Sequence, residues 1–507
     1  MPRNGSHGSN GSNLPNPARR SSLIQRVVWP AFFYAFALFN FFFYILLFIR
    51  SGAFFKKDTE QEQLRFAISR DQFWNLSKQP LPAFQHAFFK LRNGLRLHYL
   101  TNRTTESTAK SGNLFVFLHG FPDSSVMWRF CMKEPGMPIQ SARIVCLDLP
   151  NYGGSDTFEK PDTTVLDAVT EFIIAMREEH EEAADEDNKD FSTVIVGHDW
   201  GCIVGFRLAA DAPELADKFI LVNGPHVGLS LANKDRVIAS ASKIFKQFQA
   251  APSQNFGCLV KSFNVMKPLI LQTFLFGYIF AFHLPSFLVK YLGTGGNMAF
   301  LRGASRSAHG KYEDEWNAQD SLAATLGPGI MEVETRTTSG ETYSASVRLR
   351  AESHSEAFWH QTAYYRNGLA TKHWVKSLET VADLYNLESS TSAGNSPLHR
   401  RSSSSASSAM FTDSYEGCLK APATILWGEK DIALSKAICL DGIGDYLAKG
   451  SEVVLLPTTG HWTPVEKESR AAVVKVVSLC AEGGKLPAYV TKHVEEVYTG
   501  ANTMVKK

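Results

Sequence analysis

The sequence predicts a doubly wound α/β domain that is interrupted by a large, mainly helical lid and preceded by one transmembrane helix. Three observations lead to this prediction. An uncharged apolar run lies close to the N-terminus, short apolar runs then alternate with helical patterns, and this alternation stops after Gly224-Pro225 and resumes only near Pro422. With 507 residues, of which 44% are apolar, the chain can bury a core of this size.

The apolar run near the N-terminus covers Val27 to Ile49 and carries no charge. A helix of about 20 residues is long enough to cross a hydrocarbon core of about 30 Å. The run is longer and more aromatic than the apolar part of a secretory signal peptide, and Arg50 follows it directly. We therefore expect a transmembrane helix over 27–49, after a disordered tail over 1–26 that is rich in Gly, Ser and Asn.

Basic residues flank this helix on both sides and are slightly more numerous after it. They are Arg19, Arg20 and Arg26 before the helix and Arg50, Lys56, Lys57 and Arg65 after it. Because positive charge favours the cytosolic side, we expect a single-pass protein of the endoplasmic reticulum with a cytosolic catalytic domain. The glycosylation acceptor patterns at Asn75 and Asn102 would matter only if that domain were lumenal.

Short runs that are apolar on both faces fit the strands of a covered parallel sheet. They are Leu114–Leu118, Ile144–Leu147, Val194–Val196, Phe219–Val222, Thr424–Trp427 and Val453–Leu456. Helical spacing appears at Asp162–Glu178 and at Ser469–Leu479, and Phe89–Leu100 alternates like a hairpin. We expect an α/β core over 85–225 and 420–507, joined to the membrane helix by a linker or helical segment over 50–84.

The lid is expected over 226–419 and contains two polar insertions, 303–355 and 388–410, which we predict to be surface loops. Within it, Pro268 to Val289 is nearly all apolar, but its polar residues, glycine and prolines argue against a clean membrane span. We predict a buried lid helix there. The alternative is that this apolar segment contacts the same membrane as the N-terminal helix.

Composition excludes several classes of function. The net charge is +2 and no basic stripe is present, so a nucleic-acid partner is not expected. The seven cysteines are irregularly spaced without a CxxC pair, which argues against a zinc site or a disulfide framework. No metal cluster or phosphate loop is recognisable, so we expect no cofactor.

The stretch Ser192 to Gly205 contains Gly197-His198-Asp199-Trp200-Gly201 between an apolar run and a helix start. This is the layout of a G-x-S-x-G nucleophile elbow with Asp199 in place of serine. A carboxylate is already ionised at neutral pH, but it is a poor nucleophile for cleaving esters or amides. It suits attack on a saturated carbon, as in epoxides and alkyl halides, and leaves an ester on Asp199 that water must hydrolyse.

Hydrolysis of that ester requires an activated water. His461 follows the apolar run that ends at Leu456, and Asp431 follows the run that ends at Trp427. Nucleophile, acid, base is the chain order of a hydrolase triad, in which Asp431 would orient His461 and stabilise its imidazolium form.

A further motif, His119-Gly120-Phe121-Pro122, directly follows the run 114–118. The backbone N–H groups of Phe121 and Trp200 are the predicted oxyanion hole, since one donor comes from this loop and the other from the residue after the nucleophile.

These motifs resemble those of the epoxide hydrolase branch of the α/β-hydrolase superfamily. The matching residues are HGFPDSSVMWR (119–129), DLPNYGGSD (148–156), GHDWG (197–201), WGEKD (427–431) and GHW (460–462). The resemblance covers about 85–230 and 415–480 and the lid only in patches. The Phe of the first motif is similar to the soluble-type branch, and a membrane anchor ahead of such a core is similar to single-pass epoxide hydrolase-like proteins of animals.

The resemblance implies two lid tyrosines that grip the epoxide oxygen and give it a proton. The Tyr-Arg-Asn pattern near the end of the lid points to Tyr365, and a tyrosine seven residues before Pro285 is Tyr278. Tyr364 is expected to face elsewhere and to serve in packing.

The function expected from these residues is an epoxide hydrolase that converts lipophilic epoxides, such as fatty-acid or xenobiotic oxides, to vicinal diols. One alternative is a haloalkane or haloacid dehalogenase that uses the same aspartate and binds halide through Trp200. Another is a non-catalytic, membrane-bound protein that keeps the hydrolase fold and binds a ligand.

Overall fold

The computed structural model describes residues 28–102, 112–182, 191–309, 317–393, 416–482 and 490–507. The predicted tail 1–26 and residues 394–410 of the second polar insertion lie outside these ranges. The strands are β1 Gln85–Lys90, β2 Arg96–Thr101, β3 Leu114–Leu118, β4 Arg143–Leu147, β5 Thr193–His198, β6 Lys218–Val222, β7 Ala423–Gly428, β8 Glu452–Leu456 and β9 Asn502–Lys506.

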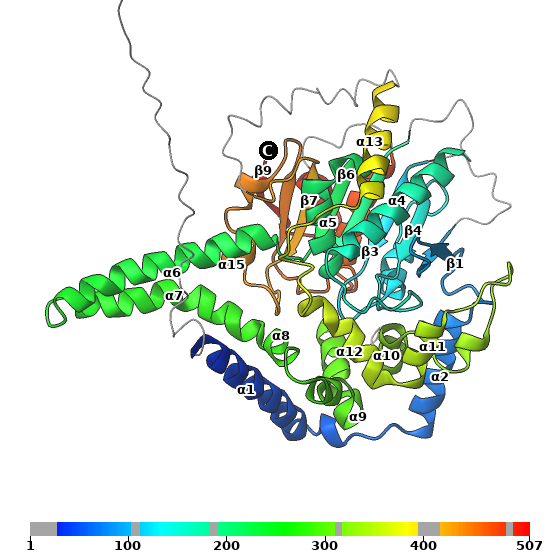
Figure 1. Ribbon diagram of the computed structural model, residues 1–507. Coiled ribbons are helices and arrows are strands. Elements are labelled where there is room, and N and C mark those ends of the chain that lie inside the picture. The colour runs from blue at the N-terminus through cyan, green and yellow to red at the C-terminus, as the bar shows by residue number, and fades with distance from the viewer. Residues whose placement is uncertain (1–27, 103–111, 183–190, 310–316, 394–415, 483–489) are drawn as a thin grey trace, which may run out of the picture.

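The strands form one nine-stranded sheet in the order β1-β2-β4-β3-β5-β6-β7-β8-β9 (Figure 1). The six from β4 to β8 in this order are parallel, whereas β1, β2 and β9 pair antiparallel with their neighbours. Every apolar run assigned to a strand lies in one, so the prediction of a parallel core sheet is confirmed. The predicted hairpin is the β1–β2 pair.

Both faces of the sheet are covered, because the side chains of a strand alternate between the faces. Along β3, Leu114, Val116 and Leu118 join one apolar cluster, whereas Phe115 and Phe117 join another. The first cluster includes residues of α4 (Thr164–Glu182) and α5 (Trp200–Asp211), and the second includes residues of α16 (Arg470–Ala481) and α17 (Val490–Glu495). The helices predicted at 162–178 and 469–479 are α4 and α16.

Most of the helices between β6 and β7 lie below the sheet in the view of Figure 1. They are α6 Val227–Ala250, α7 Phe256–Leu275, α8 Gly277–Ala281, α9 Ser286–His309, α10 Ala318–Leu326, α11 Ala345–Glu352, α12 His354–Gln361 and the 3-10 turn η7 Thr362–Tyr365. Helices α6 and α7 form a hairpin that projects from the body of the protein (Figure 1). Helix α13 (Leu378–Ala393) instead packs on α4 of the core.

The expectation of surface loops over 303–355 is wrong. This segment includes α10 and α11, and Leu322, Ala323 and Val347 are buried. Some of its polar residues hold it against the rest of the fold, because the guanidinium of Arg350 donates to the carbonyl of Gly153 and the carboxylate of Asp320 accepts from Arg65. Hydrogen bonds to distant parts of the chain therefore account for part of the polar composition.

The expectation of one buried helix over Pro268–Val289 is also wrong. Helix α7 ends at Leu275, the short α8 follows, and α9 begins only at Ser286. Phe282 is fully buried, whereas Leu271 and Phe274 are more than half exposed. The segment is thus divided between the core of the lid and the surface of the protein.

The N-terminal part begins with α1 (Trp29–Arg50), the 3-10 turn η2 (Ala53–Phe55) and α2 (Glu60–Trp74). In the part of the chain that the structure describes, α1 is the one helix that is long and apolar enough to cross a membrane. Helix α2 starts at a capping box between Thr59 and Glu62 and packs against α10.

Candidate active site

Asp199 sits on the sharp turn between β5 and α5, with φ 52° and ψ −111°. The turn needs its glycines, because a Cβ at Gly201 would lie 2.1 Å from the carbonyl oxygen of Leu118, and one at Gly197 would lie 2.4 Å from that of Gly201. The φ and ψ angles of Asp199 themselves cost on the order of 1–3 kcal/mol in a residue with a side chain. The elbow predicted from the sequence pattern is therefore formed, and it presents Asp199 at the carboxyl edge of the sheet.

The Asp199 carboxylate is held between the loop after β3 and the loop after β8. Its Oδ1 accepts a hydrogen bond of 2.8 Å from the backbone N–H of Phe121. Its Oδ2 lies 3.6 Å from Nε2 of His461. Trp200, whose backbone N–H is the second predicted oxyanion donor, is the first residue of α5 and is buried.

His461 and Asp431 meet as the chain order predicts. Nδ1 of His461 lies 2.8 Å from Oδ2 of Asp431. The other oxygen of Asp431 accepts from the backbone N–H groups of Ala433 at 2.7 Å and Leu434 at 2.9 Å. The carboxylate is thereby fixed, and it holds the imidazole with Nε2 directed at Asp199.

The electrostatics of this group favour an ion triad. Burial opposes a charge on His461, but Asp431 and Asp199 outweigh it and raise the pKa of His461 to about 10. Burial also opposes a charge on Asp199, yet its contacts with His461, His198 and Phe121 lower the pKa of Asp199. At neutral pH the imidazolium therefore lies between two carboxylates.

Tyr278 and Tyr365 come from α8 and η7, and the structure brings them together opposite Asp199. Their ring centroids are 5.8 Å apart, with one ring edge-on to the other. The indole ring of Trp200 packs edge-to-face on Tyr365, with ring centroids 5.0 Å apart. Burial is the main cause that keeps the pKa of each phenol well above its usual value, and the negative charge of Asp199 raises both pKa values further. Both phenols are therefore neutral.

Tyr364, the neighbour of Tyr365, faces away from this pair. It is buried, and its hydroxyl donates to the carbonyl of Pro150 at 2.9 Å. The prediction that Tyr364 serves in packing is confirmed.

Asn223 was missed by the sequence analysis and joins three loops of the site. It follows β6 with φ 47° and donates to Oδ2 of Asp431 at 2.9 Å. It also donates to the carbonyl of Gly460 and accepts from the hydroxyl of Thr463 at 2.6 Å. The only signal in the sequence was its place directly after a strand that carries no other predicted site residue.

His119 fixes the loop that supplies Phe121. It is fully buried, its Nδ1 lies 2.9 Å from the carbonyl of Gly120, and its Nε2 accepts from the backbone N–H of Leu149 at 3.0 Å. Burial lowers the pKa of His119. This neutral ring thus positions the loop and does not touch Asp199.

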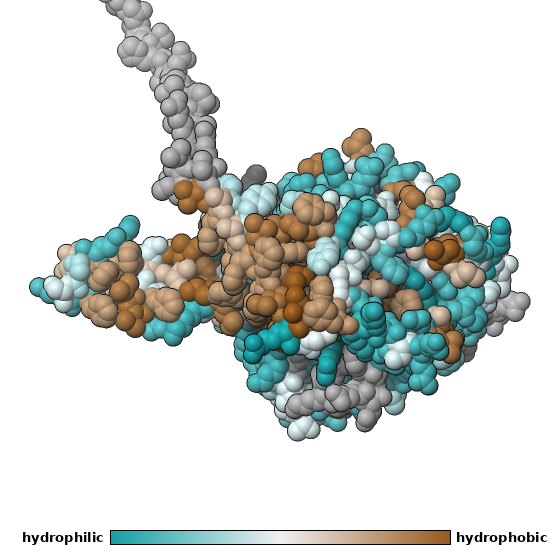
Figure 2. Space-filling view, turned by 90° about the horizontal axis from the view of Figure 1, so that it is seen from below, coloured by the Kyte–Doolittle hydropathy of each residue, from teal (hydrophilic) through white to brown (hydrophobic). Residues whose placement is uncertain are grey.

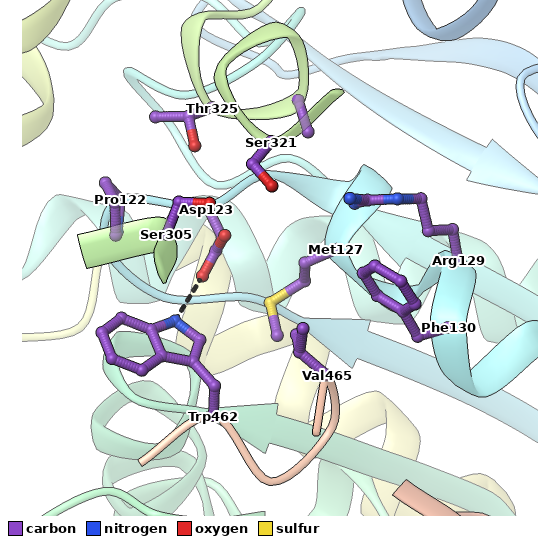
Figure 3. Close-up of a pocket in the computed structure, with 11 residues that line it drawn as sticks. Pro122, Asp123, Met127, Arg129, Phe130, Ser305, Ser321, Thr325, Trp462 and Val465 are labelled. Atoms are coloured by element: carbon purple, nitrogen blue, oxygen red, sulfur yellow. Dashed lines mark hydrogen bonds between the residues drawn. The ribbon is translucent and has the colours of Figure 1, made fainter. Parts of the chain in front are cut away.

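A small cavity of about 20 Å³ lies behind the same loop, beside Pro122 (Figure 3). It can hold about one water molecule. Asp123 and Trp462 point toward each other at its wall, and the indole N–H donates to the carboxylate at 3.1 Å. Since Trp462 follows His461, this bond joins the loop that carries His461 to the loop that carries Phe121. Asp199 and His461 do not line the cavity, so it is not the substrate pocket.

Among the described residues, no group of three or more His, Cys, Asp or Glu side chains could hold a metal ion. All seven cysteines are free thiols.

Comparisons with known proteins agree with this fold. Residues 113–260 match the family described as alpha/beta hydrolase fold. Epoxide hydrolase 4 of Homo sapiens is 26% identical over 220 residues, which cover 39% of this chain and 56% of the human protein. Epoxide hydrolase 1 of Caenorhabditis elegans is 29% identical over 175 residues, which cover 34% of this chain and 38% of the worm protein.

Among solved structures, an epoxide hydrolase from Vigna radiata aligns with 78% of this chain and 97% of its own, with 15% identity and a TM-score of 0.43. The chain spans about half the length of the curated relatives it matches. The family match over 113–260, the order of the sheet and the nucleophile elbow at its centre show that the chain has the α/β-hydrolase fold, and several of its curated relatives are named epoxide hydrolases.

Proposed function

We propose that this protein is an epoxide hydrolase that opens lipophilic epoxides to vicinal diols through a covalent ester on Asp199. The observation that carries the proposal is the pairing of two neutral phenols, Tyr278 and Tyr365, opposite an ionised carboxylate that has a histidine beside it. An epoxide needs a nucleophile at carbon and an acid at oxygen at the same time, and this arrangement supplies both. Curated relatives that bear the name epoxide hydrolase support the proposal.

In the first step, Oδ2 of Asp199 attacks an epoxide carbon and the carbon–oxygen bond of the ring breaks. The electron pair of that bond moves to the epoxide oxygen, which takes a proton from Tyr278 or Tyr365. Because both pKa values are raised, the phenols keep their protons until an alkoxide, a stronger base, develops beside them. Acid catalysis of this kind contributes about 10²–10⁴-fold to a rate.

In the second step, water hydrolyses the ester. Ester formation removes the negative charge of Asp199, so His461 loses one of the two carboxylates that favour its charged form. The imidazole can then release its proton to the tyrosinate left by the first step and accept one from water. The hydroxide adds to the carboxyl carbon of Asp199, whose Oδ1 lies at the Phe121 N–H. The bond between that carbon and the substrate oxygen then breaks, and the departing alkoxide takes the proton of the imidazolium to give the diol. The new carboxyl group returns its proton to the imidazole, which restores the resting site.

Aromatic rings surround the tyrosine pair and favour a lipophilic substrate. Phe121, Phe282 and Phe358 are buried, and the rings of Phe121 and Phe282 lie 5.5 Å and 5.3 Å from that of Tyr365. A substrate that reaches the hydroxyls therefore meets a mostly apolar wall.

The dehalogenase alternative is less well supported. A halide ion leaves without needing a proton, so it has no use for two phenols. The indole of Trp200, which would bind the halide, packs against Tyr365 with ring centroids 5.0 Å apart.

We further propose that α1 attaches the protein to the membrane of the endoplasmic reticulum and that the catalytic domain faces the cytosol. Asn102 supports this orientation, because its Nδ2 donates to the carbonyls of Ile139 and Ala142 at 2.8 Å and 2.9 Å and is not free to carry a glycan.

The full-length protein, purified in detergent, is incubated with styrene oxide and, separately, with 1-chlorohexane, and diol, alcohol and chloride are measured. Diol alone is expected. Asp199→Asn should abolish it, and His461→Gln should accumulate the ester as a mass increase equal to that of the epoxide. Chloride release would favour the dehalogenase, and turnover without any adduct in His461→Gln would contradict the two-step scheme.

A further inference from the structure

Helix α1 is packed against the lid by one of its faces. The side chains on that face recur at helical spacing and are Phe33, Phe36, Ala37, Asn40, Phe41 and Tyr44. The ring of Phe280, in α8, lies 5.0 Å from that of Phe33 and 4.9 Å from that of Phe36. Tyr44 packs edge-to-face on Phe300 of α9 at 5.8 Å.

Two polar side chains of α1 lie against α8. Asn40 is only 3% exposed, and its amide is so close to α8 that a Cβ at Gly277 would lie 2.1 Å from its Oδ1. The phenol of Tyr44 lies beside the backbone of Tyr278. An amide in the middle of an otherwise apolar helix is costly to move into lipid, so these contacts favour the docked helix.

The opposite face of α1 is apolar and open to the outside. The large side chains of α1 that are about half exposed or more include Trp29, Phe32, Phe39, Phe42, Phe43 and Leu46. The apolar surface continues onto α7 and the start of α9 through Phe256, Val260, Phe263, Leu271, Phe274 and Phe287, each about half exposed or more. Figure 2 shows this as one broad hydrophobic face that reaches from the body along the projecting hairpin. We call it the lid face.

The hairpin that extends the lid face is basic. Residues 227–275 contain six Lys and Arg residues and one acidic residue, Asp235. The basic residues are Lys234, Arg236, Lys243, Lys246, Lys261 and Lys267. Exposed Phe and Leu beside Lys and Arg are typical of helices that lie in the interface of a bilayer with anionic lipids, to which the Lys and Arg side chains are attracted.

We infer that the lid face is a docking surface for a bilayer that carries anionic lipids, and that α1 lies in the plane of its interface and does not cross it. A crossing α1 would take its docked neighbours α8 and α9 into the hydrocarbon. The ion pair between Lys290 and Glu356 would move with them. The side chain of Lys290 is 26% exposed and that of Glu356 is 43% exposed. A charged pair avoids that environment, whereas an interfacial helix sinks only about 5–10 Å and leaves it in water.

This inference deepens the proposed membrane attachment and does not depend on the proposed epoxide chemistry. Its tests therefore measure lipid contact and topology. The inference can be wrong while the protein still makes diol, and it can be right even if the protein makes none.

The first test places a fluorescent label on α7 by Phe263→Cys, in the full-length chain with Cys258 and Cys418 replaced by Ser. The matched control is Leu378→Cys on α13, which is 85% exposed and lies on the other side of the protein from α1 and α7 (Figure 1). With phosphatidylcholine–phosphatidylserine vesicles that contain doxyl lipid, the α7 label should lose most of its fluorescence and the α13 label should keep it. Less quenching is expected without phosphatidylserine.

If neither label is quenched on vesicles that bind the protein, α1 alone contacts lipid and the inference is wrong. It is also wrong if the α7 label is shielded from aqueous iodide in detergent and is not quenched by doxyl lipid. A second copy of the chain would then cover the lid face.

The second test uses the acceptor patterns that begin at Asn4, Asn10 and Asn75, two of which precede α1. If α1 crosses the membrane, either the segment before it or the domain after it lies in the lumen, together with the acceptor patterns on that side of α1. When the full-length chain is synthesised with microsomes of the endoplasmic reticulum, we expect membrane-bound protein without any glycan. The control is the same chain behind a cleavable signal peptide, in which Asn4 and Asn10 should be modified. A glycan on any of the three without that peptide would refute the in-plane position.

Discussion

Replacing Asp199 by Asn tests whether the first chemical step converts His461 into a base. The amide is neutral and has the shape of the carboxylate, so Asp199→Asn imitates the ester electrostatically. In the resting site, Nε2 of His461 lies 3.6 Å from Asp199, and its Nδ1 lies 2.8 Å from Asp431. Burial disfavours the imidazolium, but these two carboxylates raise the pKa of His461 to about 10.

The distance sets the size of the effect. Two unit charges 3.6 Å apart in an effective dielectric of about 20 attract each other by about 4–5 kcal/mol. Since one pKa unit corresponds to about 1.4 kcal/mol, Asp199→Asn should lower the pKa of His461 by about three units. The imidazole would then titrate close to neutral pH, where a general base is most effective.

The assay is an NMR titration of the full-length protein with isotope-labelled histidine. The chain has 15 histidines, and the signal of His461 is the one that His461→Gln removes. Asp431→Asn is the matched variant, because it removes the other carboxylate and should also lower the pKa. A pKa that stays near 10 in Asp199→Asn would refute the idea that charge loss at Asp199 activates His461.

The same ion pairs contribute to stability, with a defined sign. The pKa of His461 in the folded protein, about 10, lies above the ordinary value of 6.5. Their contribution is therefore complete below pH 6.5 and is lost as the pH rises through 10. Urea unfolding should show this loss in the wild type and a smaller one in Asp199→Asn.

Three further outcomes are expected. Tyr365→Phe should lower kcat/KM for an epoxide by about 10²-fold or more. The control Tyr364→Phe loses only the bond to Pro150 and should leave kcat/KM nearly unchanged. Equal effects of the two variants would show that Tyr365 is not the acid. Asn223→Ala should lower kcat and reduce the free energy of unfolding in urea by about 1–3 kcal/mol, because Asp431 loses a hydrogen-bond partner. An unchanged kcat would show that Asp431 keeps its position without Asn223. Asn102→Ala should destabilise the fold by a similar amount, and mass spectrometry of the wild type from eukaryotic cells should find no glycan on Asn102.

The parallel core could be predicted because its signal is local. Each strand is a short run of apolar residues, and the residues expected to carry chemistry follow directly where those runs end, as Asp431 and His461 do. The spacing of Gly197 and Gly201 around Asp199 reflects a close contact between strand and helix that only glycine allows. These features depend on neighbours in sequence, so a pattern reveals them.

The rest depends on contacts between distant segments. Asn223 is important because loops from three strands meet at its amide, and nothing next to it in the chain indicates this. The segment with α10 and α11 has a polar sequence but is packed, because Asp320 and Arg350 bond to residues more than 190 positions away. Helix α1 is apolar on every side, so its sequence could not show which face meets the lid.

The docking of α1 has a practical consequence for anyone who wishes to study this protein in solution. The usual way to make such a chain soluble is to clone it without its first fifty residues. Here that deletion would remove the Tyr44 phenol beside the Tyr278 backbone and the amide that fills the space beside Gly277. Rate constants from a shortened protein would then describe a site whose proposed proton donor, Tyr278, lacks the packing that α1 provides.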